Sequence, residues 1–318
     1  MHRSFVQQYQ LADLFDRTVA MVRRTWKTSL ILGGSLLILP SVLFGFALPA
    51  SMERVADAAM AAGPQAGPGA AWQILGGMGW VWVSSLLIAL VYLLAFLSVT
   101  HAARAAAFGG EETPTESLAR AFGNSFLPVI AQSLLKGLIL TVISAVPTVF
   151  VVLSLSLDAA TLVFSVLAGI TYVAGLLAGI WVWVSLLFSP QAVVFDKAGV
   201  LGGLRDSLRL VRGSWWRVFG IVLLVQIILS FAVGIISTPL VGATVIPAAT
   251  EMIRSSAEGT ISDAEIIETL TAFRSLGVAT AVGVFVQQLL TVIIIPVFYS
   301  LFYIDLKVRS GSLESEGE

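Results

Sequence analysis

Long apolar stretches separated by short polar segments dominate the hydrophobic pattern of the chain. Six of these stretches reach the roughly 20 residues that a helix needs to cross a hydrocarbon core of about 30 Å. Their approximate bounds are Ser29–Ala50, Gly76–Val99, Leu127–Leu157, Ala160–Ser189, Val218–Ile246 and Leu276–Ile304. The pattern therefore predicts an all-α integral membrane protein with six transmembrane helices, forming a single polytopic domain over residues 1–318.

The polar segments that precede the first, third and fifth spans resemble one another. Each has a hydroxyl residue, apolar positions three and four residues apart, a basic residue and then an aromatic residue. These segments are "RTVAMVRRTWKT" (17–28), "ESLARAFGNSFL" (116–127) and "DSLRLVRGSWWR" (206–217). Their recurrence predicts three repeats of an interfacial amphipathic helix followed by a transmembrane hairpin. The repeats cover approximately residues 10–104, 113–196 and 200–309.

Each of these segments places basic residues opposite an apolar stripe. In the third, the stripe consists of Leu201, Leu204, Leu208, Val211 and Trp215. This pattern is typical of a helix in the headgroup layer, where arginines meet lipid phosphates and the stripe meets acyl chains. The residues predicted to bind anionic lipid at the interface are Arg17, Arg23, Arg24, Trp26, Arg120, Arg205, Arg209, Arg212, Trp215, Trp216 and Arg217.

Local signals predict where two of these helices begin or end. Thr113 can cap the second, with Pro114 at its first position and Glu116 completing a capping box. In "LRLVRGSWWRVFG" (208–220), the third helix is expected to end at Gly213, and the fifth span to begin at Val218.

The connections between spans differ in composition. Residues 51–75 include "AAGPQAGPGAA", whose glycines and prolines predict a flexible loop. Asp158 indicates a tight hairpin between the third and fourth spans. Ser262 and Glu265 form a capping pattern that predicts a short amphipathic helix within residues 250–275.

Lysine and arginine lie mainly on one side of the predicted spans. The other side carries only Arg54, Arg254 and Arg274. Because basic loops stay in the cytoplasm, both termini are predicted to be cytoplasmic, with the protein in a bacterial inner membrane. A polar segment up to Lys27 precedes the first span, so we expect that span to be retained rather than cleaved.

Composition narrows the possible chemistry. The chain is 57% hydrophobic and 12% charged, with a mean hydropathy of +0.94, so the spans leave no room for a separate soluble catalytic domain. A net charge of −1 argues against nucleic acid as a partner. The absence of cysteine excludes disulfides, zinc–thiolate sites and iron–sulfur clusters.

Three stretches of the chain carry a family resemblance: "LADLFDRTVAMVRRTW" (11–26), "SPQAVVFDKAGVLGGLRDSLRLVRGSWWRVFGI" (189–221) and "FYIDLKVRSGSLE" (302–314). They resemble the bacterial and archaeal family named after the membrane domain of glycerophosphoryl diester phosphodiesterase. The resemblance implies a polytopic membrane protein, here without the phosphodiesterase domain. Asp196 and Asp305 resemble the acidic position after the family's even spans, where a salt bridge to a neighbouring interfacial arginine is expected.

The phosphodiesterase reaction needs histidines and carboxylates around a metal ion, and the chain has only His2 and His101. We therefore predict no metal, no cofactor and no enzymatic activity. An intramembrane serine protease is disfavoured as well, since His101 lies close to the interface and no GxSxG motif is present.

Lys136 is the one basic residue predicted deep within a span. A charge in the bilayer is costly and often functional, and Gln132 lies one turn away. We predict an intramembrane polar cluster of Gln132, Lys136, Gln226, Gln287 and Gln288. The alternative is that Lys136 extends toward the headgroups while the glutamines join helices by hydrogen bonds.

These features favour a non-enzymatic accessory or scaffold protein that engages anionic lipids or a membrane partner through cytoplasmic interfacial helices. The alternative is a small transporter or lipid-handling permease whose polar path passes Lys136. An intramembrane enzyme ranks third.

Overall fold

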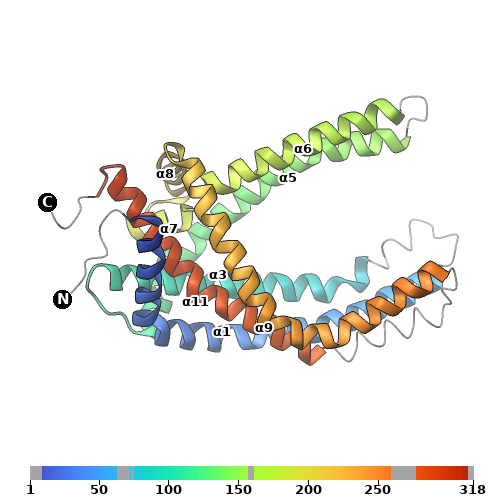
Figure 1. Ribbon diagram of the computed structural model, residues 1–318, viewed down its shortest axis with the longest axis horizontal. Coiled ribbons are helices and arrows are strands. Elements are labelled where there is room, and N and C mark those ends of the chain that lie inside the picture. The colour runs from blue at the N-terminus through green and yellow to red at the C-terminus, as the bar shows by residue number, and fades with distance from the viewer. Residues whose placement is uncertain (1–8, 63–71, 73–74, 157–160, 259–276, 314–318) are drawn as a thin grey trace. The chain divides into compact units, whose positions relative to one another are not determined.

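The computed structural model describes residues 9–62, 72, 75–156, 161–258 and 277–313, and within these ranges every element is a helix (Figure 1). The elements are α1 (Leu11–Ala62), α3 (Gly79–Ala107), α4 (Pro114–Arg120), the π-helix η1 (Ala121–Ser125), α5 (Phe126–Ser156), α6 (Thr161–Ser185), α7 (Ser189–Asp196), α8 (Val200–Arg212), α9 (Trp215–Glu258) and α11 (Gly277–Arg309).

Six helical segments in the described ranges are long and apolar enough to cross a membrane. They are Leu11–Met52, Gly79–Ala107, Pro114–Ser154, Leu162–Asp196, Trp215–Ile236 and Gly277–Arg309. The predicted all-α class is confirmed, and so is the expectation of a multi-pass membrane protein. The threefold repeat stays a prediction.

Helix α1 differs from the expectation for the first connection. It is one helix of 52 residues, so the prediction of a loop is wrong for residues 51–62. That segment, "SMERVADAAMAA", is rich in alanine and other good helix formers, and the first glycine of the connection is Gly63. The rest of this connection, the Asp158 hairpin and the helix predicted at Ser262 lie outside the described residues, apart from Trp72 and Leu75.

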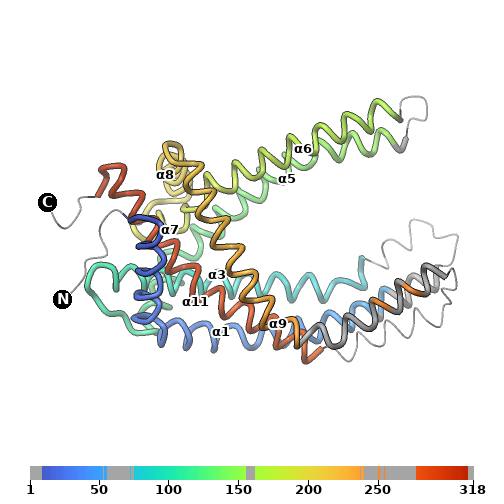
Figure 2. Tube along the Cα trace, in the orientation of Figure 1, coloured from blue at the N-terminus to red at the C-terminus, as the bar shows by residue number. Residues whose placement is uncertain are grey.

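The chain divides into two compact units. The first comprises residues 1–23, 100–224 and 297–318, and the second comprises residues 24–99 and 225–296. Figure 2 allows both to be followed along the chain. In the first unit, an aromatic core joins the start of α7 to the end of α11. The ring of Phe188 lies 5.4 Å from that of Phe302, nearly perpendicular to it, and 6.2 Å from that of Tyr303.

The second unit contains a close approach between α1 and α11. A Cβ atom at Gly45 would lie 2.5 Å from both the Cβ of Ala281 and the carbonyl oxygen of Gly277. Only glycine at position 45 allows the two backbones to lie this close. Small residues serve the same purpose at helix contacts in many membrane proteins.

Helices α5 and α6 form an antiparallel hairpin in the first unit (Figure 1). Much of its apolar surface is exposed, including Leu134, Leu138, Leu162 and Ile170. An exposed apolar surface on a membrane-spanning hairpin is suited to contact with lipid tails or with another helix.

Candidate functional site

Helix α8 carries three of the predicted lipid-binding arginines on its exposed side. Arg205, Arg209 and Arg212 are all exposed. None of the three has a hydrogen bond or ion pair with another residue in the described ranges. Their charges are therefore available to a ligand or to a lipid surface.

The opposite side of α8 packs against the rest of the first unit. Leu204, Ser207 and Val211 are buried. The Ser207 hydroxyl donates to the Ser185 carbonyl at 2.9 Å and accepts from the Phe188 amide at 3.1 Å, which fixes α8 to the connection between α6 and α7.

The apolar stripe predicted for α8 consequently splits in two. Leu204 and Val211 contact the protein interior, whereas Leu201 is 70% exposed and Leu208 is 38% exposed. Leu201 and Leu208 are two helical turns apart, as are Arg205 and Arg212, so exposed leucines and arginines lie on neighbouring strips. Gly203 explains the close packing of the buried part, because a Cβ there would meet the Gln132 amide and lie 3.1 Å from the Ser189 carbonyl.

Helix α8 ends where the sequence predicts. Gly213 is its C-cap, with φ −82° and ψ −12°, so the position does not use the left-handed freedom of glycine. Helix α9 begins at Trp215, three residues before the predicted start of the span at Val218. Trp215 stacks on Phe219 at 5.2 Å and meets Trp216 edge-on at 4.8 Å.

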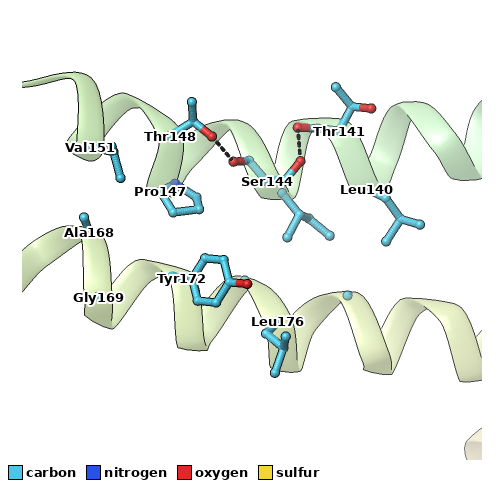
Figure 3. A pocket seen from close by; sticks show the side chains of 13 residues that line it. Leu140, Thr141, Ser144, Pro147, Thr148, Val151, Ala168, Gly169, Tyr172 and Leu176 are labelled. Carbon is cyan, nitrogen blue, oxygen red and sulfur yellow. Dashed lines mark hydrogen bonds between the residues drawn. The ribbon is translucent and has the colours of Figure 1, made fainter. Parts of the chain in front are cut away.

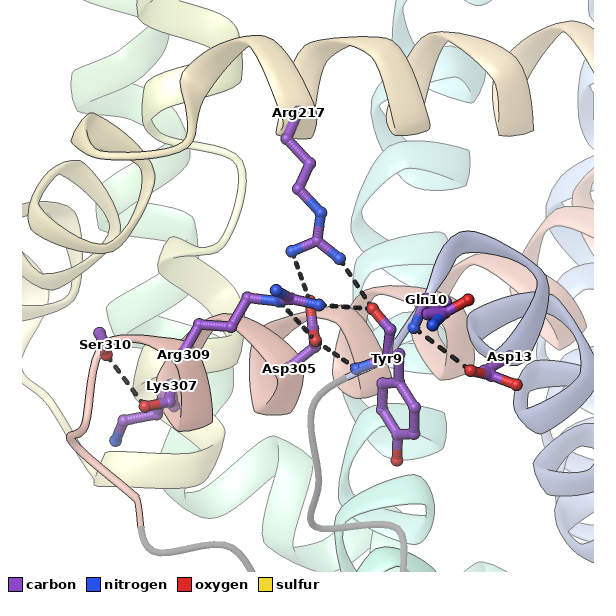
Figure 4. Close-up of polar contacts among 8 residues, drawn as sticks. All are labelled: Tyr9, Gln10, Asp13, Arg217, Asp305, Lys307, Arg309 and Ser310. Atoms are coloured by element: carbon purple, nitrogen blue, oxygen red, sulfur yellow. Dashed lines mark hydrogen bonds and ion pairs between the residues drawn. The ribbon is translucent and has the colours of Figure 1, made fainter.

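A fully buried carboxylate ties three distant segments together in the first unit (Figure 4). Asp305 accepts from the backbone amide of Tyr9 at 2.7 Å. It also pairs with Arg217 at 2.8 Å and with Arg309 at 2.9 Å. Both guanidinium groups donate in addition to the Tyr9 carbonyl, at 3.1 Å from Arg217 and 2.5 Å from Arg309. The predicted salt bridge of Asp305 is confirmed, and the charge of Arg217 is used inside the protein.

Tyr9 anchors the segment before α1 to this cluster. Its side chain is fully buried, and the guanidinium carbon of Arg17 lies 5.9 Å from the centre of its ring. Burial raises the pKa of the Tyr9 phenol above its ordinary value, and the nearby Arg17 only partly offsets this. The phenol therefore stays neutral at physiological pH. Sequence reasoning did not identify Tyr9, although it lies in the polar segment ahead of the first span.

Asp196, at the end of α7, forms a second ion-pair cluster in the same unit. The Tyr303 hydroxyl donates to Asp196, and the Lys307 ammonium lies 2.6 Å from the other carboxylate oxygen. A salt bridge at Asp196 is confirmed, but its partner is a lysine instead of the expected arginine. The next residue, Lys197, caps α7 with φ 55°.

The second predicted interfacial segment is fixed by its capping residues. Thr113 and Glu116 form the predicted capping box at the start of α4, with Pro114 in the first turn. Arg120 pairs with Glu112 at 2.5 Å.

In the first predicted interfacial segment, the side chains of Arg23, Arg24 and Trp26 are exposed. All three belong to the single helix α1.

The predicted intramembrane polar cluster is divided between the two units. Gln132 and Lys136 belong to the first, and Gln226, Gln287 and Gln288 belong to the second. Gln132 is fully buried and donates to the Val200 carbonyl at 3.1 Å, so it joins α5 to the start of α8. The role of Lys136, which is half-buried, stays a prediction.

His101 is buried at the end of α3, where its Nε2 lies 3.0 Å from the Ser125 hydroxyl in η1. Nearby, Arg104 donates to the Val194 carbonyl at 3.1 Å and so connects α3 to α7. Over the described ranges, no three histidine or acidic side chains lie close enough together to hold a metal ion.

The α5–α6 hairpin holds a mainly apolar cavity of about 800 Å³ (Figure 3). Thr141, Ser144 and Thr148 line it from α5, and each hydroxyl donates to a carbonyl of its own helix. Pro147 lacks an amide hydrogen, so the Ile143 carbonyl loses its helical donor and faces Gly175 across the hairpin. Tyr172 lines the cavity from α6 and is 63% exposed.

A family model described as a domain of unknown function (DUF7847) matches residues 22–306. No curated protein matches the chain. No solved structure matches it either. The resemblance to the membrane domain of glycerophosphoryl diester phosphodiesterase stays a prediction.

Proposed function

The chain belongs to this family of unknown function, and from its own residues we propose that it is a non-enzymatic scaffold or accessory protein of a bacterial inner membrane. In this proposal both termini are cytoplasmic. The N-terminal part of α1, together with α4 and α8, lies in the cytoplasmic headgroup layer. There these segments engage anionic lipids and offer a fixed surface to a membrane partner.

The observation that carries the proposal is the exposed side of α8. Three arginines without partners in the described ranges lie there beside two exposed leucines. Leaving such leucines in water is unfavourable, whereas at a membrane surface they enter the acyl region while the arginines meet phosphates. The Ser207 hydrogen bonds support this role because they hold the surface in one orientation.

The proposal predicts that charge reversal on α8 weakens the preference for anionic lipid. We expect Arg205→Glu/Arg209→Glu to lower the enrichment of phosphatidylglycerol around the protein about tenfold or more. Each basic residue at an anionic surface contributes about 1 kcal/mol. The measurement is lipid analysis of the protein after extraction in polymer-bounded discs from vesicles of equal phosphatidylglycerol and phosphatidylcholine.

The matched control is Arg205→Lys/Arg209→Lys, which keeps both charges and should keep the enrichment. A second control, Arg54→Glu, changes an exposed arginine on the side with few basic residues and should have little effect. Unchanged enrichment in the double glutamate variant would contradict the proposal, provided that its unfolding temperature matches that of the wild type.

A further inference from the structure

The turn between α8 and α9 opens onto a second cavity of about 800 Å³ in the first unit. Its lining includes Ser214 of the turn, Arg212 at the end of α8, Trp215 and Trp216 at the start of α9, and Leu177 and Trp181 from α6. This volume lies within the range of about 300–1,000 Å³ that is usual for small-molecule sites.

One end of this cavity is rich in hydrogen-bond donors. Arg212 is exposed and has no partner in the described ranges. The first backbone hydrogen bond of α9 runs from the Val218 amide to the Ser214 carbonyl at 2.9 Å. The amides of Trp215, Trp216 and Arg217 precede it and donate to no side-chain acceptor in the described part of the chain.

The charges around this end also favour an anion. None of the described residues that line the cavity is acidic. Helix N-termini carry a partial positive charge, which adds to that of Arg212.

The other end of the cavity is apolar and extends along α6. Leu177 lies eight residues before the end of α6 at Ser185, which corresponds to about 12 Å along the helix axis. Trp181 lies one turn closer to that end and is 55% exposed. The cavity lining therefore changes from hydrogen-bond donors at the turn to apolar side chains on α6, as a lipid phosphate and its acyl chain require.

We infer that this cavity binds one glycerophospholipid with a net negative headgroup, its phosphate at Arg212 and the α9 amides and its acyl chain along Leu177 and Trp181. The inference rests on the proposed function, because it requires the turn to lie at headgroup level. The proposed function describes an exposed face of α8 that gathers anionic lipid without a fixed stoichiometry. This inference instead names one site that holds a single lipid molecule.

Native mass spectrometry tests the site directly. The protein is reconstituted with phosphatidylglycerol and phosphatidylcholine and then released from the lipid at rising collision energy. The wild type is expected to retain one phosphatidylglycerol after all other lipid is lost, and Arg212→Ala is expected to lower that occupancy at least fivefold. Arg209→Ala, on the same helix but outside the cavity, is the matched control and should retain the lipid.

Each outcome separates the site from the broader proposal. Equal retention in Arg212→Ala and Arg209→Ala overturns the site, even where Arg205→Glu/Arg209→Glu still lowers the bulk enrichment of anionic lipid. Retained phosphatidylcholine in place of phosphatidylglycerol also overturns it, and would identify the tryptophans as a cation site. Displacement of the retained lipid by millimolar glycerol 3-phosphate would overturn the role given to the acyl chain.

Discussion

Asp305 is fully buried and accepts hydrogen bonds from two guanidinium groups and a backbone amide. A buried carboxylate of this kind is stable only because its charge is paired and its oxygens are hydrogen-bonded. The same contacts fix the segment before α1 and the start of α9 to the end of α11. Asp305 is therefore a structural residue, and its loss should disturb three segments at once.

We predict that Asp305→Ala lowers the free energy of unfolding by about 2–3 kcal/mol. Breaking a buried ion pair typically costs about 3–5 kcal/mol. Here the Arg217 and Arg309 side chains are 29% and 36% exposed, so water solvates part of their charge once the carboxylate is removed. The expected loss of stability is therefore smaller. Thermal unfolding in detergent, followed by circular dichroism, measures the change.

Asp16→Ala is the control for this variant. Asp16 is also in the first unit, is exposed and has no partner in the described ranges, so its removal should leave the unfolding temperature unchanged. Equal unfolding temperatures for Asp305→Ala and the wild type would show that the buried cluster does not stabilise the protein.

At the scale of elements, close packing decides which helix faces are available to a ligand. Half of the apolar stripe on α8 packs against the rest of the first unit because Gly203 and Ser207 are small, which leaves the arginine-bearing side exposed. In the second unit Gly45 likewise allows α1 and α11 to meet. Small residues are frequent throughout the chain, and only the structure distinguishes those in contact from those without neighbours.

Gly45→Ala is expected to destabilise the protein by about 1–3 kcal/mol, since its Cβ would overlap backbone atoms of α11. Gly34→Ala is the matched control in the same helix. Beyond its own stretch of helix, no atom of the described residues lies within 4 Å of a Cβ at that position, and alanine has the higher helix propensity by about 1 kcal/mol. The two variants should shift the unfolding temperature in opposite directions, and a shift of the same sign would contradict the packing at Gly45.

At the scale of the whole molecule, the asymmetric placement of lysine and arginine is the main guide to orientation. The wild-type chain has no cysteine, so single cysteines can be introduced without background. Arg209 and Arg54 are both exposed and lie on opposite sides in the predicted topology. Each can be replaced with little effect on packing.

We predict that a membrane-impermeant maleimide labels Arg54→Cys in intact cells and labels Arg209→Cys only after the membrane is opened. The positive-inside rule gives this direction, because the basic segments stay in the cytoplasm. Labelling of Arg209→Cys in intact cells would contradict this topology, because it would show that the α8 surface faces the outside.

The sequence by itself determined the membrane class, the six spans, the α4 capping box and the end of α8 at Gly213. These depend on local hydrophobicity and on short-range hydrogen bonds, which neighbouring residues control. Only the tertiary structure decided that α1 continues to Ala62, that half of the α8 stripe is buried and that Tyr9 meets Asp305. Contacts between residues 296 positions apart depend on how distant helices pack, and local pattern carries no record of that packing.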